Sequence, residues 1–217
     1  MRCSFCTMGI VTLVISSSLG AQERIPISKD RPATATVVAR PLTSNAVRYE
    51  TRDLNLPRFD VSPYANMRDN DIVAHLATGD SIEIVMADLA VLKATDQRVR
   101  DYASMLSKDH NENLAKTLHV ISDQHITPAP LPGDLEISRM RKMAILLENW
   151  PGGRDWDAAF LRFQIRHHQN EIDVLNKNIM FKHAEDLVDH MQRTRTTLGK
   201  HRDSARAVAT TLGVSVP

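Results

Sequence analysis

Four side chains that can bind a transition metal each stand in the middle of an otherwise apolar stripe: Glu83, His110, His168 and His201. In each segment the stripe advances by three and four residues, which places its members on one face of a helix. A buried carboxylate without a partner is strongly destabilising, so Glu83 at a core position needs one. Three imidazoles from three other helices would supply that partner most simply through a shared metal ion.

Glu171 adds another candidate ligand because it follows His168 by three residues, on the same helix face. Metal sites in helical bundles use the related Glu-x-x-His spacing. Imidazole together with carboxylate suits iron, manganese, zinc or copper better than calcium or magnesium. The pattern therefore predicts one or two transition-metal ions held by these five residues. Asp109, beside His110, is expected to orient a ligand or to act as an extra one.

The same residues also fit a site without metal, in which Glu83 and Glu171 form a buried network with protonated histidines. His167 is expected to lie beside the site without joining it, because its own apolar stripe turns away from His168. Five further histidines are expected at the surface or at helix ends: His75, His119, His125, His183 and His190.

Helical periodicity begins near residue 69 and continues almost to the end of the chain. Turn and cap residues divide it into helices expected at 69–94, 97–124, 135–149, 156–182 and 185–212. Asp96, Asp134 and Asp155 are the expected N-caps, and Asp157 is expected to interact with the helix dipole. No Gly or Pro separates the last two segments, so one long helix is the alternative there. Four long helices and a short one predict an all-α, up-and-down four-helix bundle with a short connecting helix.

The composition agrees with one domain of ordinary size and argues against a nucleic-acid-binding surface. The chain has 217 residues, of which 42% are hydrophobic and 5% aromatic, and its net charge is +1. No phosphate-binding loop, nucleophile elbow, HExxH motif or zinc-finger spacing occurs. The sequence therefore identifies no catalytic residue and leaves open whether the protein is an enzyme.

The first 21 residues have the pattern of a secretory signal peptide, with Arg2, an apolar run and small residues ending at Ala21. Cleavage is expected after Ala21 or Gly20, and an uncleaved membrane anchor is the alternative. Both cysteines, Cys3 and Cys6, lie in this segment, so cleavage leaves a mature protein without cysteine. We therefore expect an exported, periplasmic protein.

Residues 22–65 contain five of the ten prolines and no sustained apolar period. They are interpreted as a disordered or extended tether that could contact an envelope or membrane-associated partner. The bundle domain is expected to occupy residues 66–213.

Several short motifs resemble the domain-of-unknown-function 4142 family. They lie at residues 79–83, 88–90, 99–103 and 109–110, and at 156–160 in the second half. His168 and His201 match two further histidines of the family, whereas Arg195-Thr196 replaces its usual Leu-Pro. The resemblance covers about residues 66–210 and implies an exported bacterial protein with a ferritin-like helical bundle. The family's activity is not settled, so the resemblance implies fold and export rather than a reaction.

Two functions follow as hypotheses. The first is an exported bundle that binds one or two transition-metal ions, in envelope metal handling or oxidative-stress protection. The second is a non-catalytic envelope scaffold or interaction module, in which the histidines and glutamates form a structural polar network. The oligomeric state stays open.

Overall fold

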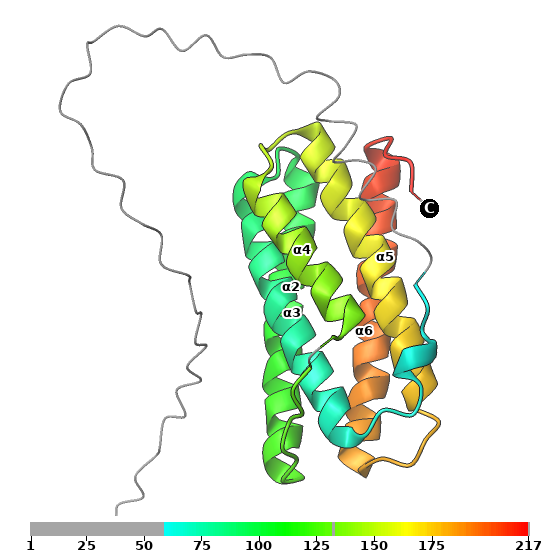
Figure 1. The fold of residues 1–217 in the computed structure, drawn as a ribbon. Helices are drawn as coiled ribbons and strands as arrows, with labels where there is room; N and C mark the ends of the chain where they lie inside the picture. The colour runs from blue at the N-terminus through cyan, green and yellow to red at the C-terminus, as the bar shows by residue number, and fades with distance from the viewer. Residues whose placement is uncertain (1–58, 132, 217) are drawn as a thin grey trace, which may run out of the picture. The chain divides into compact units, whose positions relative to one another are not determined.

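The computed structural model describes residues 59–131 and 133–216 and is helical throughout (Figure 1). A short 3-10 turn, η1 (Ser62–Tyr64), precedes five α-helices, and these residues contain no strand. The helices are α2 (Asp69–Lys93), α3 (Gln97–Asp123), α4 (Leu135–Asn149), α5 (Arg154–Asn178) and α6 (Glu185–Thr211). The predicted all-α bundle with a short connecting helix is confirmed.

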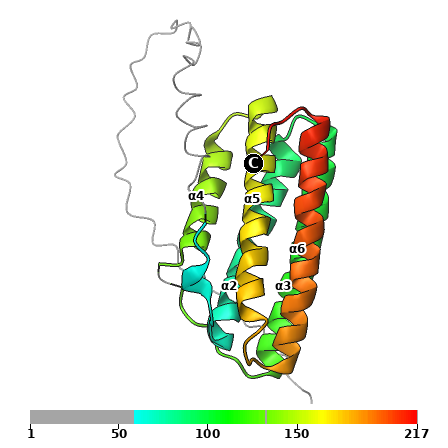
Figure 2. The same cartoon turned by 90° about the vertical axis from the view of Figure 1, so that its right-hand side faces the viewer.

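The short helix α4 reverses the chain between the two helix pairs α2–α3 and α5–α6 (Figures 1 and 2). The carboxylate of Asp157, at the start of α5, accepts a hydrogen bond from the backbone N–H of Thr95, between α2 and α3, at 3.0 Å. Helices α3 and α5 therefore begin at the same end of the bundle and run in the same direction. One long crossover of this kind occurs in ferritin-like bundles, so the arrangement is compatible with the predicted class.

Two of the three predicted helix caps are present. The Asp96 side chain accepts from Arg98 N, and the Asp134 side chain accepts from Ile137 N. The third prediction is wrong, because α5 begins two residues before the predicted start and Gly153, with φ 141°, precedes it. Residues with a side chain rarely adopt that positive φ, so a glycine occupies the N-cap position that was predicted for Asp155.

Asp157 lies in the first turn of α5, where its interaction with the helix dipole was predicted, and it is buried with a second role. Its carboxylate accepts hydrogen bonds from Thr95 N, Thr95 Oγ1 and Asp96 N. It therefore ties the first turn of α5 to the α2–α3 connection, in addition to its favourable position at a helix N-terminus.

The break between α5 and α6 is set by side chains. Helix α5 ends at Asn178, whose amide donates to Tyr64 O and accepts from Met67 N. His183 Nε2 lies 3.0 Å from Asn178 O, at the carboxyl end of the helix. These contacts end α5 before residue 182 and exclude the single long helix.

The core consists of two apolar clusters separated by a buried polar zone. One cluster includes Met86, Leu106 and Phe160, and the other includes Ile72, Leu175 and Met191. Trp156 closes the first cluster, stacking on Phe160 and donating from Nε1 to Leu147 O at 2.9 Å. Between the clusters the same helix faces carry histidines and acids, which cost free energy to bury unless they are paired.

The residues before the bundle are described only from position 59. Tyr64 is buried, and its hydroxyl donates to Asp134 Oδ1 and accepts from Glu136 N. The predicted signal peptide, both cysteines and residues 22–58 of the predicted tether lie outside the described part. None of the described helices is long and apolar enough to cross a membrane.

Candidate metal centre

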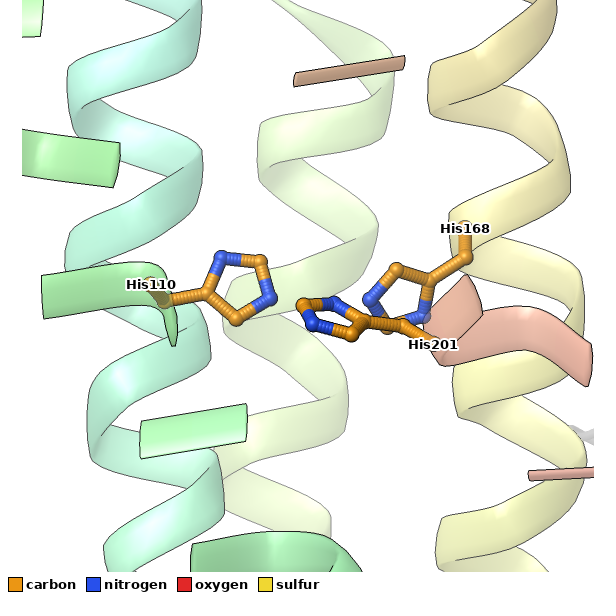
Figure 3. Close-up of side chains that lie close together, drawn as sticks. All are labelled: His110, His168 and His201. Carbon is orange, nitrogen blue, oxygen red and sulfur yellow. The ribbon is translucent and has the colours of Figure 1, made fainter. Parts of the chain in front are cut away.

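Three of the predicted ligands converge in the polar zone: His110 on α3, His168 on α5 and His201 on α6 (Figure 3). All three are buried, and their ring centroids lie 5.2–5.8 Å apart. Each ring can offer one nitrogen such that the three nitrogens lie within 4.8 Å of one another. That spacing is short enough for one metal ion to bind all three after small side-chain rotations.

On each of these rings one nitrogen is already bound to an acceptor. The pairs are His110 Nδ1 with Asp80 Oδ1 at 2.8 Å, His168 Nδ1 with Gln164 O at 2.7 Å, and His201 Nε2 with Asp109 Oδ2 at 3.0 Å. Ionised carboxylates and carbonyls only accept, so the rings donate here, and in a neutral ring the opposite nitrogen carries the lone pair.

Those opposite nitrogens are His110 Nε2, His168 Nε2 and His201 Nδ1. All three are buried and have no hydrogen-bond partner among the described residues. Metal-binding histidines commonly donate their second ring nitrogen to a carboxylate or backbone carbonyl, which fixes the ring and the tautomer. The three rings share this arrangement, with one nitrogen on an acceptor and the other without a partner.

The electrostatic environment keeps two of the rings neutral. Burial, reinforced by His201, lowers the pKa of His168 well below its ordinary value. Burial and the neighbouring His110 lower the pKa of His201 to about 4, although Asp109 opposes this effect. Neutral imidazole is the form that binds a metal, so these two rings need not lose a proton first at neutral pH.

Helix α2 contributes to this centre through Asp80, which was not predicted. Asp80 is buried and accepts from Asn113 Nδ2 at 2.9 Å as well as from His110. Thr194 in turn donates to Asn113 Oδ1 at 2.8 Å. Asp80 precedes the predicted Glu83 by three residues on the same helix face, a spacing from which its proximity could have been inferred.

Glu83 is buried but lies outside the three-histidine group. Gln164 Nε2 donates to its Oε2 at 2.8 Å, and His167 Nε2 lies 3.4 Å from its Oε1. The backbone carbonyl of Gln164 also accepts the hydrogen bond from His168 Nδ1. Gln164 therefore links the Glu83 carboxylate to the histidine group. Burial and the charge of Glu83 also raise the pKa of Tyr102 well above its ordinary value.

Glu171 also lies outside the group, because it faces His75. Both of its oxygens lie within 3.1 Å of His75 Nε2, and Asp134 Oδ2 lies 2.8 Å from His75 Nδ1. Burial opposes protonation of His75, but the two carboxylates outweigh it and raise its pKa to about 10. The expected surface position of His75 is wrong, since α4 and α5 bring Asp134 and Glu171 against it and leave it 2% exposed.

His167 is buried as well, because α4 covers the face of α5 that was expected to turn away. Its Nδ1 lies 2.9 Å from Glu136 Oε1, and Glu136 and Glu83 raise its pKa to about 9 against the effect of burial. Glu136, His167 and Glu171 form a second group with metal-compatible spacing, but their polar atoms already pair with one another, with His75 or with Glu83.

Two other predicted histidine positions differ in outcome. His190 is buried, with its Nε2 2.8 Å from Thr117 Oγ1, so the surface prediction is wrong there. His119 is exposed near the end of α3, as predicted.

The fold and this centre together define a class: an all-helical bundle with a buried histidine cluster in its middle layer. The chain belongs to the family described as domain of unknown function DUF4142, whose model matches residues 57–208. No curated protein and no solved structure matches the chain.

Proposed function

We propose that this protein binds one transition-metal ion through His110, His168 and His201. One observation carries the proposal. Each of the three clustered histidines has a buried ring nitrogen with no hydrogen-bond partner among the described residues. Burying such atoms without a partner is unfavourable, and a metal ion satisfies all three at once.

The donor set indicates the kind of ion. Three neutral imidazoles suit zinc, copper or iron, and suit manganese less because no carboxylate belongs to the group. Three protein ligands leave coordination positions for water or another small ligand. A centre of that kind supports metal storage, transfer or redox cycling, and no reaction is assigned to it.

The other predicted ligands have supporting roles in this proposal. Asp109 and Asp80 orient His201 and His110 through hydrogen bonds. Glu171 is paired with His75, and Glu83 is paired with Gln164, so neither is required to bind the ion.

We propose that the protein works in the cell envelope, in metal handling or in protection against oxidative stress. The signal-like N-terminal sequence and the resemblance to an exported family support this location. The bundle supports the role only through its metal-compatible centre.

Metal content tests the proposal directly. The protein is exported to its native compartment, purified without an affinity tag or chelator, and measured by elemental mass spectrometry. We expect close to one transition-metal ion per chain and loss of that ion in His168→Ala. His119→Ala is the matched control, because it removes an exposed imidazole that does not belong to the three-histidine group.

A second candidate function, a metal-free envelope scaffold, is favoured by the separate network around His75 and His167. These buried histidines are charged and paired with Glu171, Asp134 and Glu136, which stabilises the bundle without an ion. A metal content near zero that persists after anaerobic loading with iron, manganese, zinc and copper would favour the scaffold.

A further inference from the structure

A cavity of about 440 Å³ lies between α4 and α5, on the side of α5 that carries His167. Its volume falls in the range of about 300–1,000 Å³ that small-molecule sites occupy in proteins. The cavity is formed by the helix that reverses the chain, and it is separate from the three-histidine group.

The polar lining of this cavity is strongly basic. Four cationic side chains line it, namely Arg139, Lys142, Arg162 and Arg166. The whole chain has a net charge of only +1, so this concentration is local.

The one carboxylate in the lining is already shared. Glu136 lies 2.9 Å from His167 Nδ1, accepts from Asn170 Nδ2 at 3.2 Å, and lies 3.6 Å from Arg139 Nη1. Against Arg139, Lys142 and Arg162 alone, this single negative charge leaves the lining with an excess of positive charge, which favours an anionic ligand.

The rest of the wall is apolar. Met143, Leu146 and Phe163 line it, and the Phe163 ring stacks on His167 with centroids 5.5 Å apart and planes 5° from parallel. An inorganic anion would contact the cations but leave this apolar wall in contact with water. A ligand with both an anionic group and an apolar body uses both parts of the lining.

We propose that the α4–α5 cavity binds a small organic carboxylate with an apolar body. The carboxylate pairs with Lys142, Arg139 and Arg162, and the body lies against Met143, Leu146 and Phe163. Alkyl and aromatic carboxylates share this chemistry. The proposal does not depend on metal binding at the histidine group.

The test is isothermal titration calorimetry of the full chain with decanoate below its micelle concentration, and with benzoate in parallel. Decanol and inorganic phosphate serve as ligand controls. Decanol has the apolar body without an anionic group, and phosphate is an anion without an apolar body. We expect saturable binding of at least one carboxylate, and binding of decanol and phosphate at least tenfold weaker. The carboxylate that binds more tightly identifies the alkyl or the aromatic source.

Two protein variants locate the site. Lys142→Glu changes an exposed cavity residue without affecting the core, and it should weaken carboxylate binding at least tenfold. Arg141→Glu makes the same charge change at an exposed position of α4 outside the cavity lining, and it should leave affinity within about twofold. The absence of saturable carboxylate binding, equal binding of phosphate, or an equal loss in Arg141→Glu would each overturn the proposal.

Discussion

The carboxylate of Asp80 on α2 lies 2.8 Å from His110 Nδ1 on α3, and both residues are buried. Helix α2 supplies no member of the histidine group. Through Asp80 it nevertheless determines that Nε2 of His110, and not Nδ1, is available to that group. A second hydrogen bond, from Asn113 to Asp80, holds the carboxylate in place.

Asp80→Asn should weaken metal binding about tenfold or more while leaving the fold intact, because it removes the charge that orients His110 and increases its basicity. Competition with a chromophoric chelator measures the change in affinity. Asp88→Asn is the control, since Asp88 is exposed on the same helix and accepts a hydrogen bond from Ser107 instead of His110. Unchanged affinity in Asp80→Asn would separate this aspartate from the centre.

His110→Ala and His168→Ala should each abolish stoichiometric metal binding, because two imidazoles alone hold a transition metal weakly. Glu171→Gln should retain the metal, since Glu171 pairs with His75 instead. Elemental analysis of the three purified variants distinguishes these outcomes. Full metal content in both histidine variants would show that the ligand assignment is wrong, and loss in Glu171→Gln would restore Glu171 as a ligand.

The buried histidines should fall into two protonation states in the metal-free protein at pH 7, one charged and one neutral. His75 and His167, with pKa values of about 10 and 9, should be protonated because carboxylates surround them. His201, with a pKa of about 4, and His168, whose pKa is also lowered, should be neutral because burial and neighbouring imidazoles disfavour their charge. Nitrogen-15 NMR of the imidazole rings between pH 5 and 8 reports both states, and titration of all four near pH 6.5 would contradict the assignment.

His75→Gln should destabilise the protein most in mildly acidic solution. The folded-state pKa of His75 is about 10, against an ordinary value of 6.5, so its stabilisation is complete below pH 6.5 and disappears as pH rises to about 10. The pKa of Asp134 is lowered to about 2, so its share of the stabilisation is present above about pH 4 and is lost as pH falls towards 2.

The expected penalty for breaking this buried pair is about 3–5 kcal/mol near pH 6. Urea unfolding of both proteins at pH 6 and pH 10 measures the difference. A penalty that stays the same at both pH values would mean that His75 is neutral in the folded protein.

Asp157→Asn should cost about 1–3 kcal/mol of stability, because a buried carboxylate that accepts three hydrogen bonds is replaced by a weaker acceptor. Asp155→Asn tests the helix-dipole contribution alone, since Asp155 is exposed in the same first turn, and should cost less than about 1 kcal/mol. Thermal unfolding compares the two, and equal losses would reduce Asp157 to a helix-dipole role.

The sequence by itself determined the helices and the faces that they bury. Apolar spacing of three and four residues is a local property, and the caps at Asp96 and Asp134 act within a few residues of themselves. For the same reason His110, His168 and His201 could be placed near the middle of buried stripes, and mid-helix positions lie at similar heights in an antiparallel bundle.

Only the tertiary structure decided which side chains meet. The position of α4 over α2 and α5 is a non-local packing outcome, and it buries His75 and His167 beside Asp134, Glu136 and Glu171. On α2, small differences in helix rotation place Asp80 against His110 and Glu83 against Gln164, although both acids lie on the same face. Periodicity specifies a face to within about one residue step of 100°, whereas a hydrogen bond requires a separation of about 3 Å, and only the packed helices provide that precision.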